Sequence, residues 1–170
     1  VHATNILLEG KANALVTAPI SKIAWHKAGH KFAGQTELLG ELTNKQTSML
    51  FTAISPNNGW RFNTLLATTH IPIIEISERL TDKLIYSKLD LLKDFSHKFN
   101  RDINLKVAGL NPHAGEEGIL GKEERNLIQQ SLSRWKSDNP KINLEGPISP
   151  DSCWLSSLKA WNKKGAAKHE

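Results

Sequence analysis

Two histidines in the 170-residue sequence stand where they could bind a metal ion or move a proton. His70 directly follows an apolar stretch and comes shortly before Pro72. His113 lies in the segment 110–121, which is rich in glycine and carries carboxylates. A neutral imidazole is a common metal ligand and proton carrier. Either ring could instead be held by a backbone carbonyl, and its role would then be structural only.

Two other segments offer groups that could hold an anionic substrate. The first is Thr17-Ala18-Pro19-Ile20-Ser21-Lys22, which ends in a hydroxyl and an ammonium group. The second is Gly34-Gln35-Thr36-Glu37, where a glycine precedes an amide and a hydroxyl at an expected helix start. Backbone N–H groups at a helix start can face a ligand. Both patterns are also typical of an ordinary helix start, with Thr36 as the N-cap of the second.

The apolar pattern predicts strands that alternate with helices. Strands are expected over 13–17, 48–54, 63–68 and 103–110, and helices over 20–27, 37–42, 85–99 and 122–135. Turn-forming residues at 55–59 predict that the second and third strands are antiparallel neighbours. The pattern weakens after Pro140. The alternation favours an α/β fold, layered α/β/α with a mixed, mostly parallel sheet, in which ligands bind beyond the carboxyl ends of strands.

Composition excludes several classes of protein. No apolar run approaches the length of about 20 residues that a membrane span needs, so no membrane partner is expected. The formal net charge is +5, but the basic residues are dispersed, which argues against a nucleic-acid partner. The single cysteine, Cys153, excludes a disulfide framework and favours a cytoplasmic location. The start at Val1, without a methionine, suggests a chain cut from a longer one.

Five segments come in a defined order: Ala-Leu-Val-Thr-Ala-Pro-Ile-Ser-Lys (14–22), Gly-Gln-Thr-Glu (34–37), Ala-Thr-Thr-His-Ile-Pro (67–72), Leu-Asn-Pro-His-Ala-Gly-Glu (110–116) and Gly-Pro-Ile-Ser-Pro-Asp (146–151). Together they closely resemble the 4-hydroxythreonine-4-phosphate dehydrogenase family of pyridoxal phosphate biosynthesis. Each motif is weak alone, and their order makes the resemblance specific. It covers residues 1–155 and leaves 156–170 as a basic tail of uncertain structure.

The resemblance implies an NAD- or NADP-dependent oxidation of a phosphorylated amino-acid substrate, 4-phosphooxy-L-threonine. The resulting 3-keto acid would lose carbon dioxide to leave 3-amino-2-oxopropyl phosphate. The resemblance also implies a divalent metal (zinc, magnesium or cobalt) held by three histidines between two α/β lobes. A homodimer with a shared active site is implied as well. Such a metal would lower the pKa of the substrate alcohol and favour hydride transfer.

Residue by residue, the resemblance implies that His70 and His113 are two of the metal ligands. It implies that Gln35 and Thr36 bind substrate. Many relatives have histidine in place of Gln35. Glutamine still donates and accepts hydrogen bonds, but it cannot titrate, so a proton-transfer role is not expected at this position.

The resemblance further implies that residues 1–170 are the central part of a two-lobed dehydrogenase. The family's N-terminal part and its C-terminal Tyr-His-Asp-Gln-Gly motif, which carries the third metal histidine, have no counterpart in the sequence. We therefore expect the chain alone to bind metal weakly and not to turn over. The alternative is an inactive fragment that serves only as a metal- or phosphate-binding α/β module.

Overall fold

The computed structural model describes residues 1–32, 34–99 and 103–163. The chain forms two compact units, unit 1 (Val1–Ser48) and unit 2 (Met49–Glu170). Part of the basic tail, residues 156–163, is described and lies largely in a helix, whereas residues 164–170 fall outside the described residues. Each unit has its own internal contacts.

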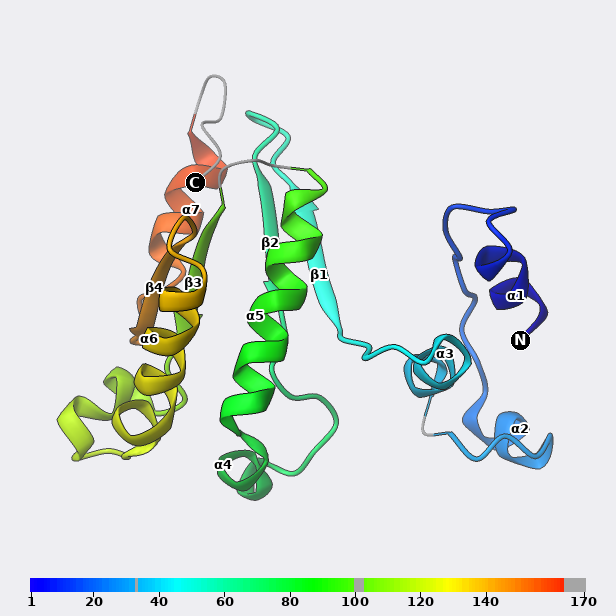
Figure 1. The fold of residues 1–170 in the computed structure, drawn as a ribbon, viewed down its shortest axis with the longest axis horizontal. Helices are drawn as coiled ribbons and strands as arrows, with labels where there is room; N and C mark the ends of the chain where they lie inside the picture. Colours follow the sequence, from blue (N-terminus) through cyan, green and yellow to red (C-terminus); the bar gives the residue numbers. More distant parts are fainter. Residues whose placement is uncertain (33, 100–102, 164–170) are drawn as a thin grey trace. The chain divides into compact units, whose positions relative to one another are not determined.

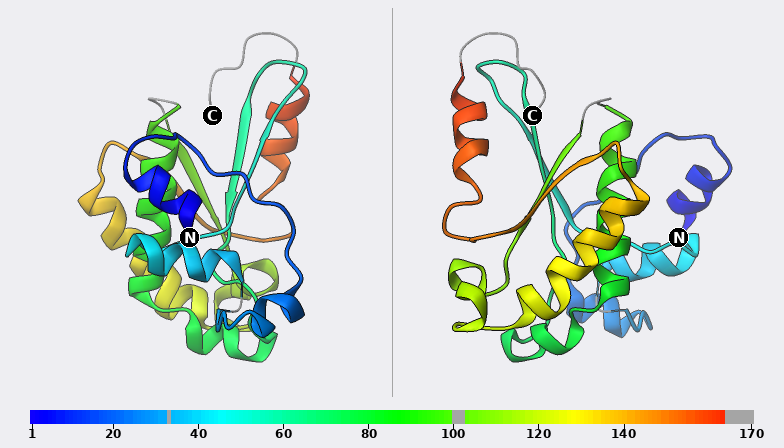
Figure 2. Two further views of the ribbon diagram at one scale, coloured as in Figure 1. Left: turned by 90° about the vertical axis from the view of Figure 1, so that its right-hand side faces the viewer. Right: turned by 60° about the vertical axis from the view of Figure 1, so that its left-hand side comes forward.

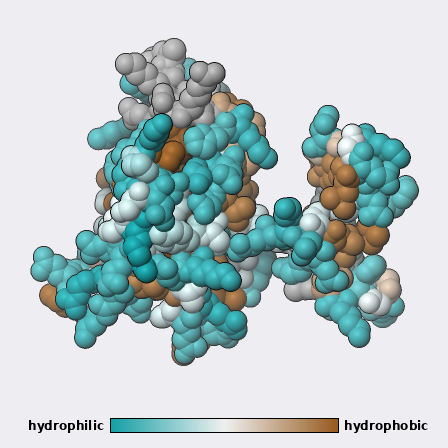
Figure 3. All heavy atoms as spheres, in the orientation of Figure 1, coloured by the Kyte–Doolittle hydropathy of each residue, from teal (hydrophilic) through white to brown (hydrophobic). Residues whose placement is uncertain are grey.

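Unit 1 consists of three short helices, shown in blue to cyan in Figure 1: α1 (His2–Leu8), α2 (Lys22–Lys27) and α3 (Gln35–Thr43). The predicted strand over 13–17 is wrong, because these residues are in neither helix nor strand. A strand needs a hydrogen-bonded neighbour, and no described segment pairs with 13–17. Val16 accordingly is 94% exposed. Figure 3 shows several apolar side chains at the surface of this unit.

The starts of α2 and α3 differ in how they are capped. The Ser21 hydroxyl accepts a hydrogen bond from the backbone N–H of Ala24 at 3.3 Å, which makes Ser21 the N-cap of α2. The prediction that Thr36 caps α3 is wrong. The N-cap is Gly34, with an extended backbone and no side-chain cap, so Gln35 and Thr36 both lie in the first helical turn.

Unit 2 begins with a hairpin of β1 (Leu50–Ile54) and β2 (Arg61–Leu65). The two strands are antiparallel, with Phe51 opposite Thr64, as the turn residues at 55–59 predicted. Ser55 closes the turn by donating its backbone N–H to the Trp60 carbonyl at 2.8 Å. The tip of the hairpin contacts the end of the chain, since the Ser55 hydroxyl also donates to the Trp161 carbonyl at 2.7 Å.

The rest of unit 2 alternates helices with two parallel strands. The helical elements are η1 (Ile73–Glu75), α4 (Ile76–Arg79), α5 (Asp82–His97), η2 (Pro112–Gly118), the π-helix η3 (Glu124–Ile128), α6 (Gln129–Asp138) and α7 (Leu155–Asn162). The strands β3 (Asn104–Ala108) and β4 (Asn143–Ile148) pair in parallel, with Leu105 opposite Leu144. The helix predicted over 122–135 is confirmed as η3 followed by α6. Strand β4 was not predicted.

The core of unit 2 lies where α5 and α6 cover the parallel strands. Trp135 is fully buried there, with Leu89, Leu105 and Leu132 around it. The Trp135 indole N–H donates to Asp90 Oδ1 at 3.0 Å, which satisfies the polar atom of this buried ring. Both views of Figure 2 show the strands between α5 and α6 on one side and α7 on the other. The predicted layered α/β class is therefore confirmed, with the strands held as one antiparallel and one parallel pair.

A cavity of about 320 Å³ opens between the two strand pairs. It is lined by Arg61 and Asn63 of β2, by Asn104 and Lys106 of β3, and by residues of α5 and α7. Gln35, Thr36, His70 and His113 do not line it. We take it as a feature of the fold rather than as the candidate site. No helix within the described ranges is long and apolar enough to cross a membrane.

Candidate functional site

The segment that carries His113 has an unusual backbone. Six consecutive residues, His113–Gly118, have positive φ, with values of 52°, 54°, 80°, 43°, 57° and 101° along the chain. The left-handed conformation costs about 1–2 kcal/mol for each residue other than glycine, and only Gly115 and Gly118 among the six are glycines. The turn therefore persists only because surrounding contacts hold it.

Glu124, at the start of η3, holds the residues that lead into this turn. Its Oε1 accepts hydrogen bonds from the backbone N–H groups of Leu110 and Asn111, at 2.7 and 2.6 Å. Its Oε2 accepts from the Asn111 side-chain amide at 2.9 Å. Burial, the largest effect, raises the pKa of the Glu124 carboxyl, but the hydrogen bonds from Asn111 and Leu110 outweigh it and leave that pKa below its ordinary value.

Glycine allows the turn to approach Glu124 closely. A Cβ on Gly115 would lie 2.7 Å from Glu124 Oε2 and 2.8 Å from the Gly121 carbonyl oxygen. A Cβ on Gly109 would lie 3.2 Å from Glu124 Oε1. The glycines of this segment therefore let the backbone wrap around one buried carboxylate, since any larger residue at Gly115 would overlap it.

Asp151 faces the His113 ring from the segment after β4. Its Oδ2 lies 3.6 Å from His113 Nδ1 and accepts a hydrogen bond from the His113 backbone N–H at 3.4 Å. The Ser149 hydroxyl donates to the same oxygen at 2.9 Å. This hydrogen bond and the one from His113 hold the pKa of Asp151 below its ordinary value. A carboxylate that accepts a hydrogen bond from Nδ1 orients an imidazole so that Nε2 can bind a metal, and Asp151 lies just beyond that distance.

His113 and Asp151 reach each other from the carboxyl ends of neighbouring parallel strands. His113 comes after β3 and Asp151 after β4. Loops at this edge of a parallel sheet converge, and ligands of α/β folds bind there. The position after a parallel strand, which pointed to His113 in the sequence, is therefore shared by Asp151.

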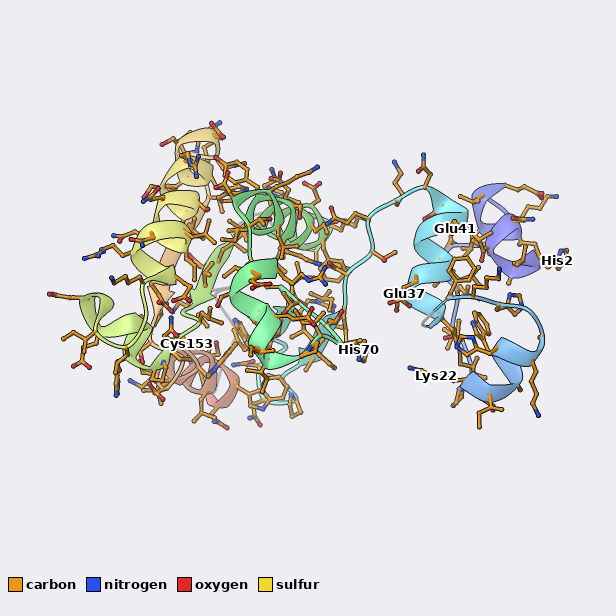
Figure 4. All side chains as sticks on the ribbon, turned by 90° about the horizontal axis from the view of Figure 1, so that it is seen from below. His2, Lys22, Glu37, Glu41, His70 and Cys153 are labelled. Carbon is orange, nitrogen blue, oxygen red and sulfur yellow. The ribbon has the colours of Figure 1, made fainter. Side chains whose placement is uncertain are left out.

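His70 lies in the loop between β2 and η1. It is exposed, and like His113 it has a positive φ, 56°. The preceding strand ends at Leu65 rather than directly before the histidine. Figure 4 shows the labelled His70 and the yellow-green η2 turn on different sides of unit 2. Across the described residues there is no group of three or more His, Cys, Asp and Glu side chains that could hold a metal ion.

The two predicted substrate-binding residues belong to unit 1. The Gln35 side-chain amide donates to the Ala18 carbonyl at 2.9 Å, which joins the segments 14–22 and 34–37. Thr36 is exposed in the first turn of α3. The structure therefore brings two of the sequence motifs together within unit 1. Ser21 is engaged as the α2 cap.

Asp151 and Glu124 did not stand out as functional residues from the sequence. The sequence could have indicated Asp151, because Ser149-Pro150-Asp151 ends one of the five family-like motifs and, in the structure, follows a strand. Glu124 lies in the first turn of the helix predicted over 122–135, where a carboxylate ordinarily complements the helix dipole. Its contact with Leu110 and Asn111 spans 14 and 13 positions of sequence, and no local pattern indicates it.

Together the fold and this site define an α/β protein with a polar site beyond the ends of two parallel strands. Residues 1–163 match the family model for the pyridoxal phosphate biosynthetic protein PdxA. The chain belongs to this family. It spans about half the length of the curated relatives that it matches.

Named relatives and solved structures agree with this membership. The 4-hydroxythreonine-4-phosphate dehydrogenase of Synechococcus sp. (strain RCC307) is 52% identical over 95% of this chain and 49% of its own length. That of Synechocystis sp. (strain ATCC 27184 / PCC 6803 / Kazusa) is 43% identical over 93% of this chain and 46% of its own length. The crystal structure of the Klebsiella pneumoniae enzyme matches with a TM-score of 0.81 and 28% identity, covering 99% of this chain and 49% of the other.

The described residues offer fewer ligands than a metal ion needs. His113 suits a ligand, because it is exposed and has a carboxylate beside Nδ1. A structural or catalytic zinc needs three or four protein ligands, and the described residues of one chain do not assemble them. The described residues therefore do not form a complete metal site by themselves.

Proposed function

We propose that this chain forms part of an enzyme that oxidises 4-phosphooxy-L-threonine with NAD or NADP. The secondary alcohol would give up a hydride to the nicotinamide and a proton to the surroundings, which yields the 3-keto acid. That β-keto acid then loses carbon dioxide to give 3-amino-2-oxopropyl phosphate, a step towards pyridoxine 5'-phosphate. The observation that carries the proposal is the match of residues 1–163 to the family, together with the names of the relatives.

Within this proposal His113 contributes a ligand to a divalent metal such as zinc, magnesium or cobalt. His70 lies on a different side of unit 2 from the η2 turn, so as a ligand of the same ion it would have to come from the second copy of the homodimer. The Asp151 carboxylate beside His113 Nδ1 supports such a role for His113. Ligands from beyond the described residues complete the set, and a homodimer with a shared active site is one way to supply them. Gln35 and Thr36 bind the substrate through an amide and a hydroxyl, which suits a phosphorylated amino acid.

The test uses the complete coding sequence that contains this chain. The purified product is mixed with 4-phosphooxy-L-threonine, a divalent metal and either NAD or NADP, and reduced nicotinamide is followed at its absorbance band. We expect turnover with at least one cofactor. His113→Ala and His70→Ala should each lower kcat/KM at least about 100-fold, because even neighbours of metal ligands change activity 10–100-fold. His97→Ala removes an exposed histidine on α5 and should change nothing.

A second candidate function is an inactive module that binds metal or phosphate. The absence of a three-ligand group among the described residues favours it for the 170-residue chain alone. For this chain we expect no reduction of NAD or NADP and weak binding of zinc by calorimetry. Measurable turnover by the 170-residue chain would contradict that expectation. If the product of the complete coding sequence binds zinc but does not reduce NAD or NADP, the proposed enzyme activity is refuted and the metal-binding module remains.

A further inference from the structure

We propose that Glu124 is a positioning residue for His113. Its buried carboxylate fixes the two residues that lead into the left-handed turn, and the turn then sets the place of the His113 ring. The inference rests on the proposed role of His113 as a metal ligand. It adds that the geometry of this ligand is set by a residue 11 positions further along the chain, which does not touch substrate, cofactor or metal.

The hydrogen bonds of Glu124 all end on the approach to the turn. Its two oxygens accept from the backbone N–H groups of Leu110 and Asn111 and from the Asn111 side chain. Glu124 is only 4% exposed, so water does not compete for these donors. A carboxylate is an acceptor-only group with about four lone-pair sites, which suits three N–H donors. The contact therefore fixes the Asn111 backbone firmly.

A proline carries this constraint from Asn111 to His113. Asn111 has φ −92° and ψ 156°, the extended conformation that a residue before proline prefers. The ring of Pro112 restricts its own φ to about −65°. His113 follows directly, so little backbone freedom separates it from the Glu124 contact. Asp151 then meets the His113 backbone N–H and Nδ1 from the other side.

The charge of Glu124 matters as well as its shape. A glutamine would place its NH2 group against either the two backbone N–H groups or the Asn111 amide, and in each case two donors would face each other. Asn111 cannot relieve this by turning its amide, because its Nδ2 also donates to Glu123 Oε2 at 2.9 Å. We therefore expect Glu124→Gln to release the turn although the two side chains have nearly the same volume.

The experiment uses the 170-residue chain labelled for nuclear magnetic resonance. Hydrogen exchange of the Leu110 and Asn111 amides reports the Glu124 contact directly. One-bond Cα–Hα couplings of His113 and its neighbours report the sign of φ. Glu124→Gln should speed exchange of these two amides about 10- to 100-fold, the range for losing a hydrogen bond to a charged group. It should also shift the couplings of 113–117 away from positive φ.

The matched control is Glu117→Gln, which makes the same substitution at an exposed position of the same turn. It should leave exchange and couplings unchanged. If Glu124→Gln has no more effect than Glu117→Gln, the proposal is wrong. If Glu124→Gln does not fold, Asn111→Ala keeps the backbone contacts of Glu124 and removes the donor to its Oε2, together with the contact to Glu123 Oε2. This variant must then alter the His113 couplings while the signals of the hairpin β1–β2 stay in place. Unaltered couplings in Asn111→Ala would overturn the proposal.

Zinc titration of the same samples separates this inference from the proposed function. If His113 is a ligand, Glu124→Gln should weaken binding of zinc at least tenfold, and His113→Ala should weaken it further. If the unsubstituted chain and His113→Ala bind zinc equally, the ligand role of His113 fails. The exchange and coupling data would still decide whether Glu124 sets the geometry of the turn.

Discussion

Replacing Gly115 by alanine tests how tightly the His113 turn wraps around Glu124. At φ +80° alanine is strained whatever the space around it. The left-handed conformation costs about 1–2 kcal/mol for such a residue. The new Cβ would also lie 2.7 Å from Glu124 Oε2, so the carboxylate must move away from the Asn111 amide. Losing a hydrogen bond to a charged group costs about 1.5–3 kcal/mol, which brings the expected total to about 2.5–5 kcal/mol.

Gly59→Ala is the matched control, because Gly59 has a similar φ, +74°, but its Cβ would meet nothing within 4 Å. It should cost only the conformational part, about 1–2 kcal/mol. Both variants are compared by urea unfolding of the chain, followed by tryptophan fluorescence, to which the buried Trp60 and Trp135 contribute. The reasoning fails if the two variants lose the same free energy of unfolding to within about 0.5 kcal/mol. The conformational cost of alanine at positive φ would then explain both losses without any overlap with Glu124.

Three further outcomes are expected. The pKa of Glu124 is lower in the folded chain, so its carboxylate stabilises the fold above the unfolded pKa of about 4.3. This stabilisation should vanish as pH falls through the lower folded pKa. Urea titrations at several pH values should therefore show a smaller loss of unfolding free energy at acid pH in Glu124→Gln than in the unsubstituted chain. Leu132→Ala in the core should cost about 2–5 kcal/mol by the same unfolding assay, whereas Leu155→Ala, at a residue that is 56% exposed, should stay within about 0.5 kcal/mol. Asp151→Asn should weaken zinc binding by calorimetry about 10- to 100-fold if His113 is a ligand, and the exposed Asp94→Asn should leave it unchanged.

Elements with a clear period and strong turn residues could be predicted from the sequence. The apolar face through Ile85 and Leu89 predicted α5, and the turn at 55–59 predicted the β1–β2 hairpin. The alternation of strand and helix patterns predicted the α/β class, and the order of five motifs indicated the family. These features depend on local patterns, so tertiary contacts did not override them.

Features that depend on a distant partner could not be predicted. Strand β4 contains Gly146-Pro147, which is typical of a turn, and only its pairing with β3 makes it a strand. A Cβ on Gly146 would lie 2.7 Å from the Val107 carbonyl oxygen, so this glycine serves close packing of two strands rather than a turn. The segment 13–17 shows the reverse case, a strand-like pattern without a described neighbour to pair with.

The backbone adds an argument for His70 and His113 that does not depend on the family. Of the six histidines that the structure describes, these two have positive φ, at 56° and 52°. A residue other than glycine adopts this conformation only where its surroundings enforce it, and such strain is concentrated at functional sites. Asp151 accepts a hydrogen bond from the His113 backbone N–H, and Glu124 holds Asn111, two residues before it. Both histidines were predicted as candidate ligands because each follows an expected strand. Their positive φ is a second, independent feature that the two share.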